Sequence, residues 1–171
     1  MLSPMSWRPL LEQTDLAVGL SAAKIDALYA LFEKRTMRAG TVVFEEESRG
    51  RELFFICEGR VEIVMRGLGG ADNRMVVNEM RPGHIFGEMA LVDGAPRSGE
   101  ARTKDDSILM MLREENFRLL AERELRIGYI VMRNLARTMA SRLRTMNMRM
   151  RNNHDWVSIL GNLEIPTHHE R

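Results

Sequence analysis

The stretch FGEMALVDGAPRS occupies residues 86–98, and it decides how the rest of the chain is interpreted. Gly87 stands where a loop enters a short helix, and a helix start presents unpaired backbone N–H groups that attract an anion. Nine residues after Glu88 comes Arg97, held by the ring of Pro96. One small cleft there could offer backbone donors, a guanidinium for a phosphate and a carboxylate for sugar hydroxyls. The stretch therefore predicts a site for a sugar phosphate.

Short β-type runs surround this stretch, separated by turn residues roughly every eight to twelve positions. The run 53–57 is apolar at every position, so we expect one face in a core between strands and the other under a helix, with Cys57 buried. The pattern predicts an α+β fold, in which a small antiparallel β-barrel of jelly-roll type is flanked by an N-terminal helix and a long C-terminal helix. The expected strands are 41–44, 53–58, 61–66, 75–80 and 107–112.

The chain is expected to have one main domain with helical additions. Residues 1–20 are interpreted as an irregular arm packed on the body, and 21–125 as the barrel with short flanking helices. The first of these helices is expected to start at residue 21 and to end near Lys34. Residues 126–151 form a long helix, and residues 152–171 a C-terminal tail with room for one short helix.

The long helix 126–151 is basic, with seven arginines and no carboxylate, whereas the chain as a whole has a net charge of only +1. Its apolar residues recur at about the helical period and predict a stripe through which two copies form a homodimer. The arginines are interpreted as a solvated face rather than a nucleic-acid contact. The stripe consists of Ile130, Leu135, Met139, Leu143, Met146 and Met150.

The 86–98 stretch closely resembles the phosphate-binding cassette of cyclic nucleotide-binding domains. Gly40, Gly59 and Gly83 resemble the turn glycines of that family and stand at the expected separations. The resemblance covers roughly residues 10–151. It implies an eight-stranded barrel that binds a cyclic nucleotide, with the long helix as a lid over the purine.

The resemblance also implies roles for individual residues of the cassette. Arg97 pairs with the cyclic phosphate, and Glu88 accepts a hydrogen bond from the ribose 2′-hydroxyl. Ser98 lies beside the phosphate or the purine. The backbone donors come from Gly87, Met89 and Ala90.

The base would be held by residues outside the cassette. Val77 and Met80 are expected to form an apolar wall, and Arg142 to face Glu88. A looser alignment of the long helix brings Met146 and Asn147 to the base. The expected ligand is cAMP, with cGMP second, and neither a metal nor a further cofactor is expected.

One departure from the family concerns Glu100, which follows Ser98 and Gly99 where relatives often have small or hydroxyl residues. A side chain pointing out of the barrel would have little effect on the ligand. A side chain pointing inward would weaken phosphate binding by repulsion.

An enzyme of cupin type is a rival interpretation, because it shares a similar small barrel. Such an enzyme needs several imidazole and carboxylate ligands on neighbouring strands. Only His84 lies in the barrel, while the other three histidines lie near the C-terminus. We therefore expect no catalysis and no metal site.

The remaining expectations concern partners and location. A single cysteine and the lack of a long apolar run indicate a cytoplasmic protein that does not span a membrane. About twenty residues after the long helix are too few for a DNA-reading head, so no sequence-specific DNA binding is expected. A sensor of this kind would signal in trans to an effector that is unknown. The alternative is a dimeric scaffold whose pocket is degenerate and binds no nucleotide.

Overall fold

The computed structural model of the protein describes residues 6–67 and 73–161. The helices are α1 (Arg8–Glu12), the 3-10 helix η1 (Asp15–Ala17), α2 (Ala22–Tyr29), α3 (Glu88–Asp93), α4 (Glu114–Arg123) and α5 (Leu125–Gly161). The strands are β1 (Glu33–Met37), β2 (Val42–Phe44), β3 (Glu52–Glu58), β4 (Val61–Arg66), β5 (Arg74–Met80), β6 (Ile85–Phe86), β7 (Glu100–Thr103) and β8 (Ser107–Arg113).

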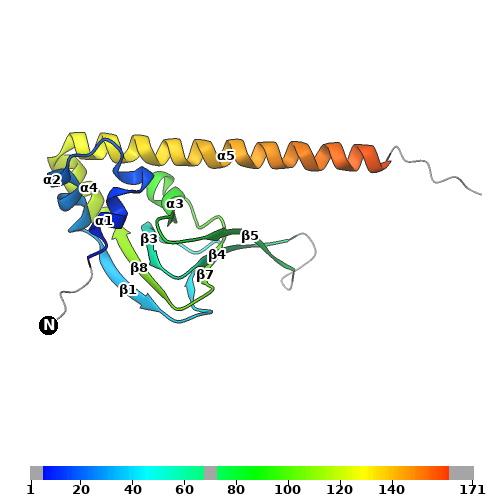
Figure 1. The fold of residues 1–171 in the computed structure, drawn as a ribbon, viewed down its shortest axis with the longest axis horizontal. Helices are drawn as coiled ribbons and strands as arrows, with labels where there is room; N and C mark the ends of the chain where they lie inside the picture. Colours follow the sequence, from blue (N-terminus) through cyan, green and yellow to red (C-terminus); the bar gives the residue numbers. More distant parts are fainter. Residues whose placement is uncertain (1–5, 68–72, 162–171) are drawn as a thin grey trace, which may run out of the picture. The chain divides into compact units, whose positions relative to one another are not determined.

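The eight strands form two four-stranded antiparallel sheets, with strand orders β1-β8-β3-β6 and β2-β7-β4-β5. Their inner faces share one apolar core, to which β3, β6 and β8 contribute from one sheet and β4, β5 and β7 from the other. The predicted α+β class with a jelly-roll-like antiparallel body and flanking helices is confirmed (Figure 1). The strands make two facing sheets rather than one closed ring.

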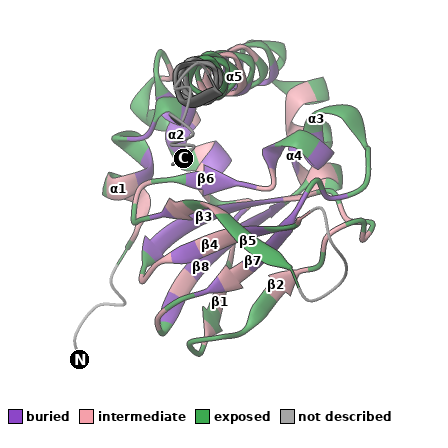
Figure 2. Ribbon diagram, turned by 90° about the vertical axis from the view of Figure 1, so that its right-hand side faces the viewer, coloured by how far each residue is buried: buried purple, intermediate pink, exposed green. Residues whose placement is uncertain are grey.

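Strand β3 separates two cores, as its apolar sequence predicts. Phe54 and Ile56 lie in the core between the sheets, while Leu53, Phe55 and Cys57 belong to a second core with α1, α2, α4 and α5. Figure 2 shows β3 buried along most of its length. The buried position of Cys57 is confirmed, and burial raises the pKa of its thiol to about 12, which makes the thiol unreactive at neutral pH.

The N-terminal region differs from the expected irregular arm and single helix. Residues 8–12 form α1, because Pro9 falls in the first helical turn, where the missing N–H of proline is tolerated. Helix α2 ends at Tyr29 instead of near Lys34. The chain then forms β1, which pairs with β8 and alternates half-buried with exposed residues.

Strands β6 and β7 were also absent from the expected set. β6 has only two residues, and β7 alternates the charged Glu100 and Arg102 with Ala101 and Thr103, so neither gives a clear hydrophobic signal.

Helix α5 runs to Gly161, so the expected boundary at residue 152 falls inside it, and residues 162–171 lie outside the described part. The chain forms two compact units, Met1–Leu135 and Ala136–Arg171. No described helix has both the length and the apolar character needed to cross a membrane.

The first turns of α5 are tied to the N-terminal region by Asn134. Its side chain is 3% exposed, and Nδ2 donates to the carbonyl of Leu16 at 3.0 Å and to that of Val18 at 2.8 Å. Leu16 lies within η1 and Val18 follows it, so one buried amide satisfies two carbonyls that have no backbone donor among the described residues.

Replacing Asn134 with Ala is expected to lower the free energy of unfolding by about 1–3 kcal/mol, because two carbonyls lose their donor, that of Leu16 in a buried site and that of Val18 in a partly buried one. Urea unfolding followed by circular dichroism measures this. Asn116→Ala on α4 is the matched control, since Asn116 is half-buried and has no side-chain hydrogen bond among the described residues. Equal losses in the two variants would contradict the prediction.

Candidate functional site

The predicted cassette lies at α3, which begins after Gly87 and ends before Gly94, both with left-handed backbone. Gly87 has φ +74°, and a Cβ there would stand 2.8 Å from Nη1 of Arg97 and 2.9 Å from the carbonyl oxygen of Glu52. Glycine is therefore needed at residue 87 for both its conformation and its close contact with Arg97.

Arg97 is the centre of the site, with a side chain only 3% exposed. Nη1 donates to the carbonyls of Glu52 at 2.9 Å and Gly87 at 3.0 Å, and Nη2 donates to Oε2 of Glu52 at 2.8 Å. The guanidinium also lies 4.2 Å from the ring centroid of Phe44, close enough for a cation–π contact. Two backbone carbonyls, a carboxylate and an aromatic ring thus fix one buried cation.

Two of the five N–H donors of Arg97 are left over by these bonds. One of them is on Nε, which is buried and has no hydrogen-bond partner among the described residues. Burial lowers the pKa of the Arg97 guanidinium, and the carboxylates of Glu52 and Glu88 act against that shift. Because an arginine remains protonated at neutral pH even so, Arg97 is a buried cation with donor capacity to spare.

The other cassette residues divide into buried and exposed ones. Glu88 and Ala90 are buried, and Glu88 is close enough to Arg97 for its carboxylate to raise the pKa of the guanidinium. Met89 and Ser98 are exposed, with the Ser98 hydroxyl 3.7 Å from the sulfur of Met89. The six predicted cassette residues therefore lie close together, four of them at the start of α3 and two in the loop that follows α3. They are Gly87, Glu88, Met89, Ala90, Arg97 and Ser98.

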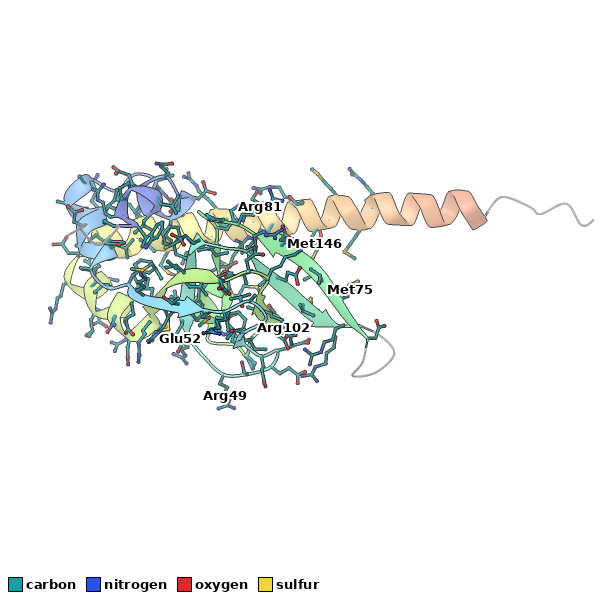
Figure 3. The ribbon with its side chains drawn as sticks, turned by 60° about the horizontal axis from the view of Figure 1, so that its bottom comes forward. Arg49, Glu52, Met75, Arg81, Arg102 and Met146 are labelled. Carbon is teal, nitrogen blue, oxygen red and sulfur yellow. The ribbon has the colours of Figure 1, made fainter. Side chains whose placement is uncertain are left out.

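A cavity of about 280 Å³ adjoins the guanidinium. Its charged lining consists of Arg35, Arg49, Glu52 and Arg97. Figure 3 shows Arg49 extending from the loop after β2 toward solvent. Glu88 and Ser98 do not line this cavity. The apolar walls come from Met37, Val43, Phe44, Phe54 and Met111.

The two residues expected to form the base wall have different environments. Met80 is 3% exposed and packs into the core between the sheets, whereas Val77 is half-buried. The pairing of β4 with β5 skips Val77, since Val64 pairs with Val76 and Ile63 with Asn78. Such a bulge changes the direction of the side chains around it and is common beside functional sites.

Arg142, Met146 and Asn147 belong to the second compact unit. Met146 and Asn147 are exposed, and Arg142 is half-buried. Their contact with a bound base stays a prediction.

Glu100 points away from the space between the sheets. Its neighbour Ala101 is fully buried in the inter-sheet core, so alternation along β7 puts Glu100 on the outer face. There its carboxylate binds Nη1 of Arg74 at 2.7 Å and Nη2 of Arg102 at 2.8 Å. Of the two orientations considered, the outward one is found, and its charge is compensated by two arginines.

Sequence reasoning missed Glu52 and Phe44, which hold Arg97 from β3 and β2. Both are far from the cassette in sequence, and neither is among the residues to which the resemblance assigned a role in binding. The nearest signal is Gly50, where a Cβ would stand 2.7 Å from Oε2 of Glu52.

Within residues 6–67 and 73–161, the structure has no group of three or more His, Cys, Asp or Glu side chains placed to hold a metal ion.

Comparison with known proteins identifies the class. The sequence profile described as "Cyclic nucleotide-binding domain" matches residues 34–124, which is more than half of the chain. The protein therefore belongs to the cyclic nucleotide-binding domain family, a family of ligand-binding regulatory domains, and the resemblance seen in the sequence is confirmed.

Individual relatives come from different kinds of regulator. The chain is 30% identical over 132 residues to the cyclic AMP receptor protein of Thermus thermophilus, covering 77% of this chain and 58% of that protein. It is 34% identical over 96 residues to the cAMP-dependent protein kinase regulatory subunit of Mycosarcoma maydis, covering 54% of this chain and 18% of that protein.

A solved structure, that of the Thermus thermophilus catabolite activator protein, superposes with a TM-score of 0.72 at 28% identity. The superposition covers 82% of this chain and 63% of that one. The chain thus spans less than two thirds of the length of these relatives.

Gly87→Ala is expected to destabilise the fold by about 1–3 kcal/mol, because the new methyl group is strained at positive φ and collides with Arg97. Urea unfolding measures this loss of unfolding free energy. Gly40→Ala is the control, since Gly40 has φ +78° but no atom within 4 Å of an added Cβ. It should show the strain without the collision, so a loss as large as that of Gly87→Ala would contradict the close contact with Arg97.

Proposed function

We propose that the protein is a cyclic nucleotide sensor, with cAMP as the first candidate ligand and cGMP as the second. The cyclic phosphate binds Arg97, the ribose 2′-hydroxyl donates to Glu88, and backbone N–H groups of Gly87, Met89 and Ala90 complete the phosphate site. Ser98 lies beside the phosphate or purine. The protein performs no chemistry on the nucleotide.

One observation carries this proposal: Arg97 is a buried cation whose Nε lacks a hydrogen-bond partner among the described residues. Buried polar groups in proteins are nearly always satisfied, so an unused donor at the centre of a cassette favours a ligand as its partner. A phosphate takes two parallel hydrogen bonds from a guanidinium, which matches the two donors that remain. Because Nε is shielded from solvent, a phosphate reaches it only after a small local movement.

The choice of cAMP is supported by the names of the relatives, two of which are a cyclic AMP receptor and a cAMP-dependent kinase subunit. The base itself would meet Val77, Met80 and the α5 residues Arg142, Met146 and Asn147. None of these residues distinguishes adenine from guanine by a specific contact, so cGMP remains the second candidate ligand.

The second part of the proposal is that α5 associates with α5 of another copy. Within the unit Ala136–Arg171, Met139, Leu143, Met146 and Met150 follow one another at alternating steps of four and three residues, the spacing of a coiled-coil seam. Leu143, Met146 and Met150 are between 58% and 65% exposed. Two residues of the predicted stripe do not contribute: Ile130 and Leu135 are buried in the first unit.

The sensor is proposed to act in the cytoplasm and to signal in trans, to an effector that remains to be identified. A helix changes its position or its partner only if nucleotide binds the two arrangements with different affinity. The alternative function is a dimeric scaffold with a degenerate pocket, which would associate through α5 and bind neither nucleotide.

Nucleotide binding is tested by isothermal titration calorimetry of nucleotide-stripped protein with cAMP and cGMP. Wild type is expected to bind one nucleotide per chain, and Arg97→Ala to lose about 2–5 kcal/mol of binding free energy, because the phosphate loses its charged partner. Arg118→Ala on α4 is the control, since Arg118 is an exposed arginine that pairs only along its own helix among the described residues. Binding by Arg97→Ala as tight as wild type would contradict the site, and no binding by folded wild type would favour the scaffold.

Association through α5 is tested by sedimentation velocity. Wild type is expected to dimerise and Leu143→Lys to be monomeric, because the new charge would be buried in an apolar seam. Thr145→Lys adds the same charge on the same helix but off the stripe, and should remain dimeric. Dimers of unchanged strength in Leu143→Lys would exclude this stripe as the interface.

A further inference from the structure

The two-sheet body is open along one side, between the edge strands β1 and β2. Each of these strands ends its sheet, in the orders β1-β8-β3-β6 and β2-β7-β4-β5. The cavity of about 280 Å³ lies between them, because Met37 of β1 and Val43 and Phe44 of β2 line it. Phe54 of β3 and Met111 of β8 line its buried end. The cavity is therefore a gap between the sheets at the side opposite to β5 and β6.

This cavity is distinct from the site proposed for the cyclic nucleotide. Of the cassette, β5 and α5 residues assigned to that site, Arg97 alone lines the cavity. Nη1 of Arg97 faces the cassette, where it donates to the carbonyl of Gly87. On the cavity side, a Cβ at Gly50 would stand 3.1 Å from Nη2 of Arg97. Arg97 thus lies between the two spaces, and the carboxylate of Glu52 compensates its charge on the cavity side.

Arg35 brings a second positive charge to the cavity. Arg35 and Met37 are half-buried and alternate with exposed residues, so both lie on the inner side of β1. Arginine is rarely placed on an inner face unless its charge is paired. The ion-pair partner of Arg35 is Glu33, whose carboxylate also binds Arg113. One carboxylate is thus shared by two guanidinium groups, which leaves the charge of Arg35 partly uncompensated.

Arg49 adds a third positive charge where the cavity meets solvent. It is exposed, extends from the loop after β2 (Figure 3), and has no ion pair with any residue that the structure describes. Together with Arg35 and Arg97 it gives the lining three guanidinium groups, against the single carboxylate of Glu52. The cavity therefore favours an anion, and the charge available to that anion lies at the solvent end.

The inner part of the cavity is apolar. Phe54 and Met111 are buried, and the ring centroids of Phe44 and Phe54 lie 5.9 Å apart. The volume is nearly twice that of a cavity of ~150 Å³ that holds benzene, so it has room for one aromatic ring with a short chain. Apolar walls with a few charged groups at one end are typical of small-molecule sites.

We propose that this cavity is a second ligand site, which takes a small carboxylate anion with an apolar body. The carboxylate pairs with Arg35 and Arg49 at the solvent end, where it keeps part of its hydration. The apolar body lies against Phe44, Phe54 and Met111. Binding of such an anion does not require a cyclic nucleotide, so this site is independent of the proposed function.

The probe for this site is 3-phenylpropionate, which joins one aromatic ring to a carboxylate through a short chain. Its titration into ¹⁵N-labelled, nucleotide-stripped protein is followed by NMR. Saturable binding is expected, with the largest amide shifts in β1 and β2. The uncharged 3-phenylpropanamide and the ringless acetate should each bind roughly tenfold more weakly or worse. Largest shifts at the cassette, equal binding of the amide, or no saturable binding of the probe would each overturn the proposal.

Variants separate the cavity from overall charge. Arg49→Gln should weaken probe binding roughly tenfold, because the carboxylate loses a charged partner. Lys34→Gln is the matched control, since Lys34 is exposed on the outer side of β1, and it should bind the probe as wild type does. Val43→Phe fills part of the cavity and should abolish saturable binding, with its fold checked by circular dichroism. Unchanged binding by Arg49→Gln, or an equal loss in Lys34→Gln, would overturn the proposal.

Discussion

The burial of one guanidinium, that of Arg97, is the constraint on which the cassette depends. The Arg97 side chain is only 3% exposed. A cation buried to this degree is tolerated only when opposite charge and hydrogen bonds compensate for its lost hydration. The compensation comes from three parts of the chain: the carbonyl of Gly87, the carbonyl and carboxylate of Glu52, and the ring of Phe44. The burial of the arginine therefore requires that these parts of the chain lie together in the folded state.

The two-sheet body provides those positions. β3 carries Glu52 at its start and pairs with β6 and β8, and β6 leads directly into Gly87 and α3. Because β3 is apolar on both faces, it is held between the inter-sheet core and the helical core. The site is thus built at the start of a strand that is buried along most of its length, where the backbone has little freedom to move.

The contacts of Arg97 divide into those that position the guanidinium and one that compensates its charge. Carbonyl groups position Arg97 without neutralising it, whereas the carboxylate of Glu52 neutralises it while remaining partly in water. Position and charge are therefore supplied by separate groups.

The sequence by itself determined the family, the cassette around Gly87 and Arg97, the two-faced burial of β3 and the long helix, because these depend on local spacing and periodicity. Only the tertiary structure decided the outward direction of Glu100, the burial of Ile130 and Leu135, and the pairing of Arg97 with Glu52. Strands β1, β6 and β7 were likewise found only there, since short or polar strands are defined by their neighbours rather than by their own residues. Contacts between residues 45 apart in sequence depend on how the sheets pack, and no local pattern records that.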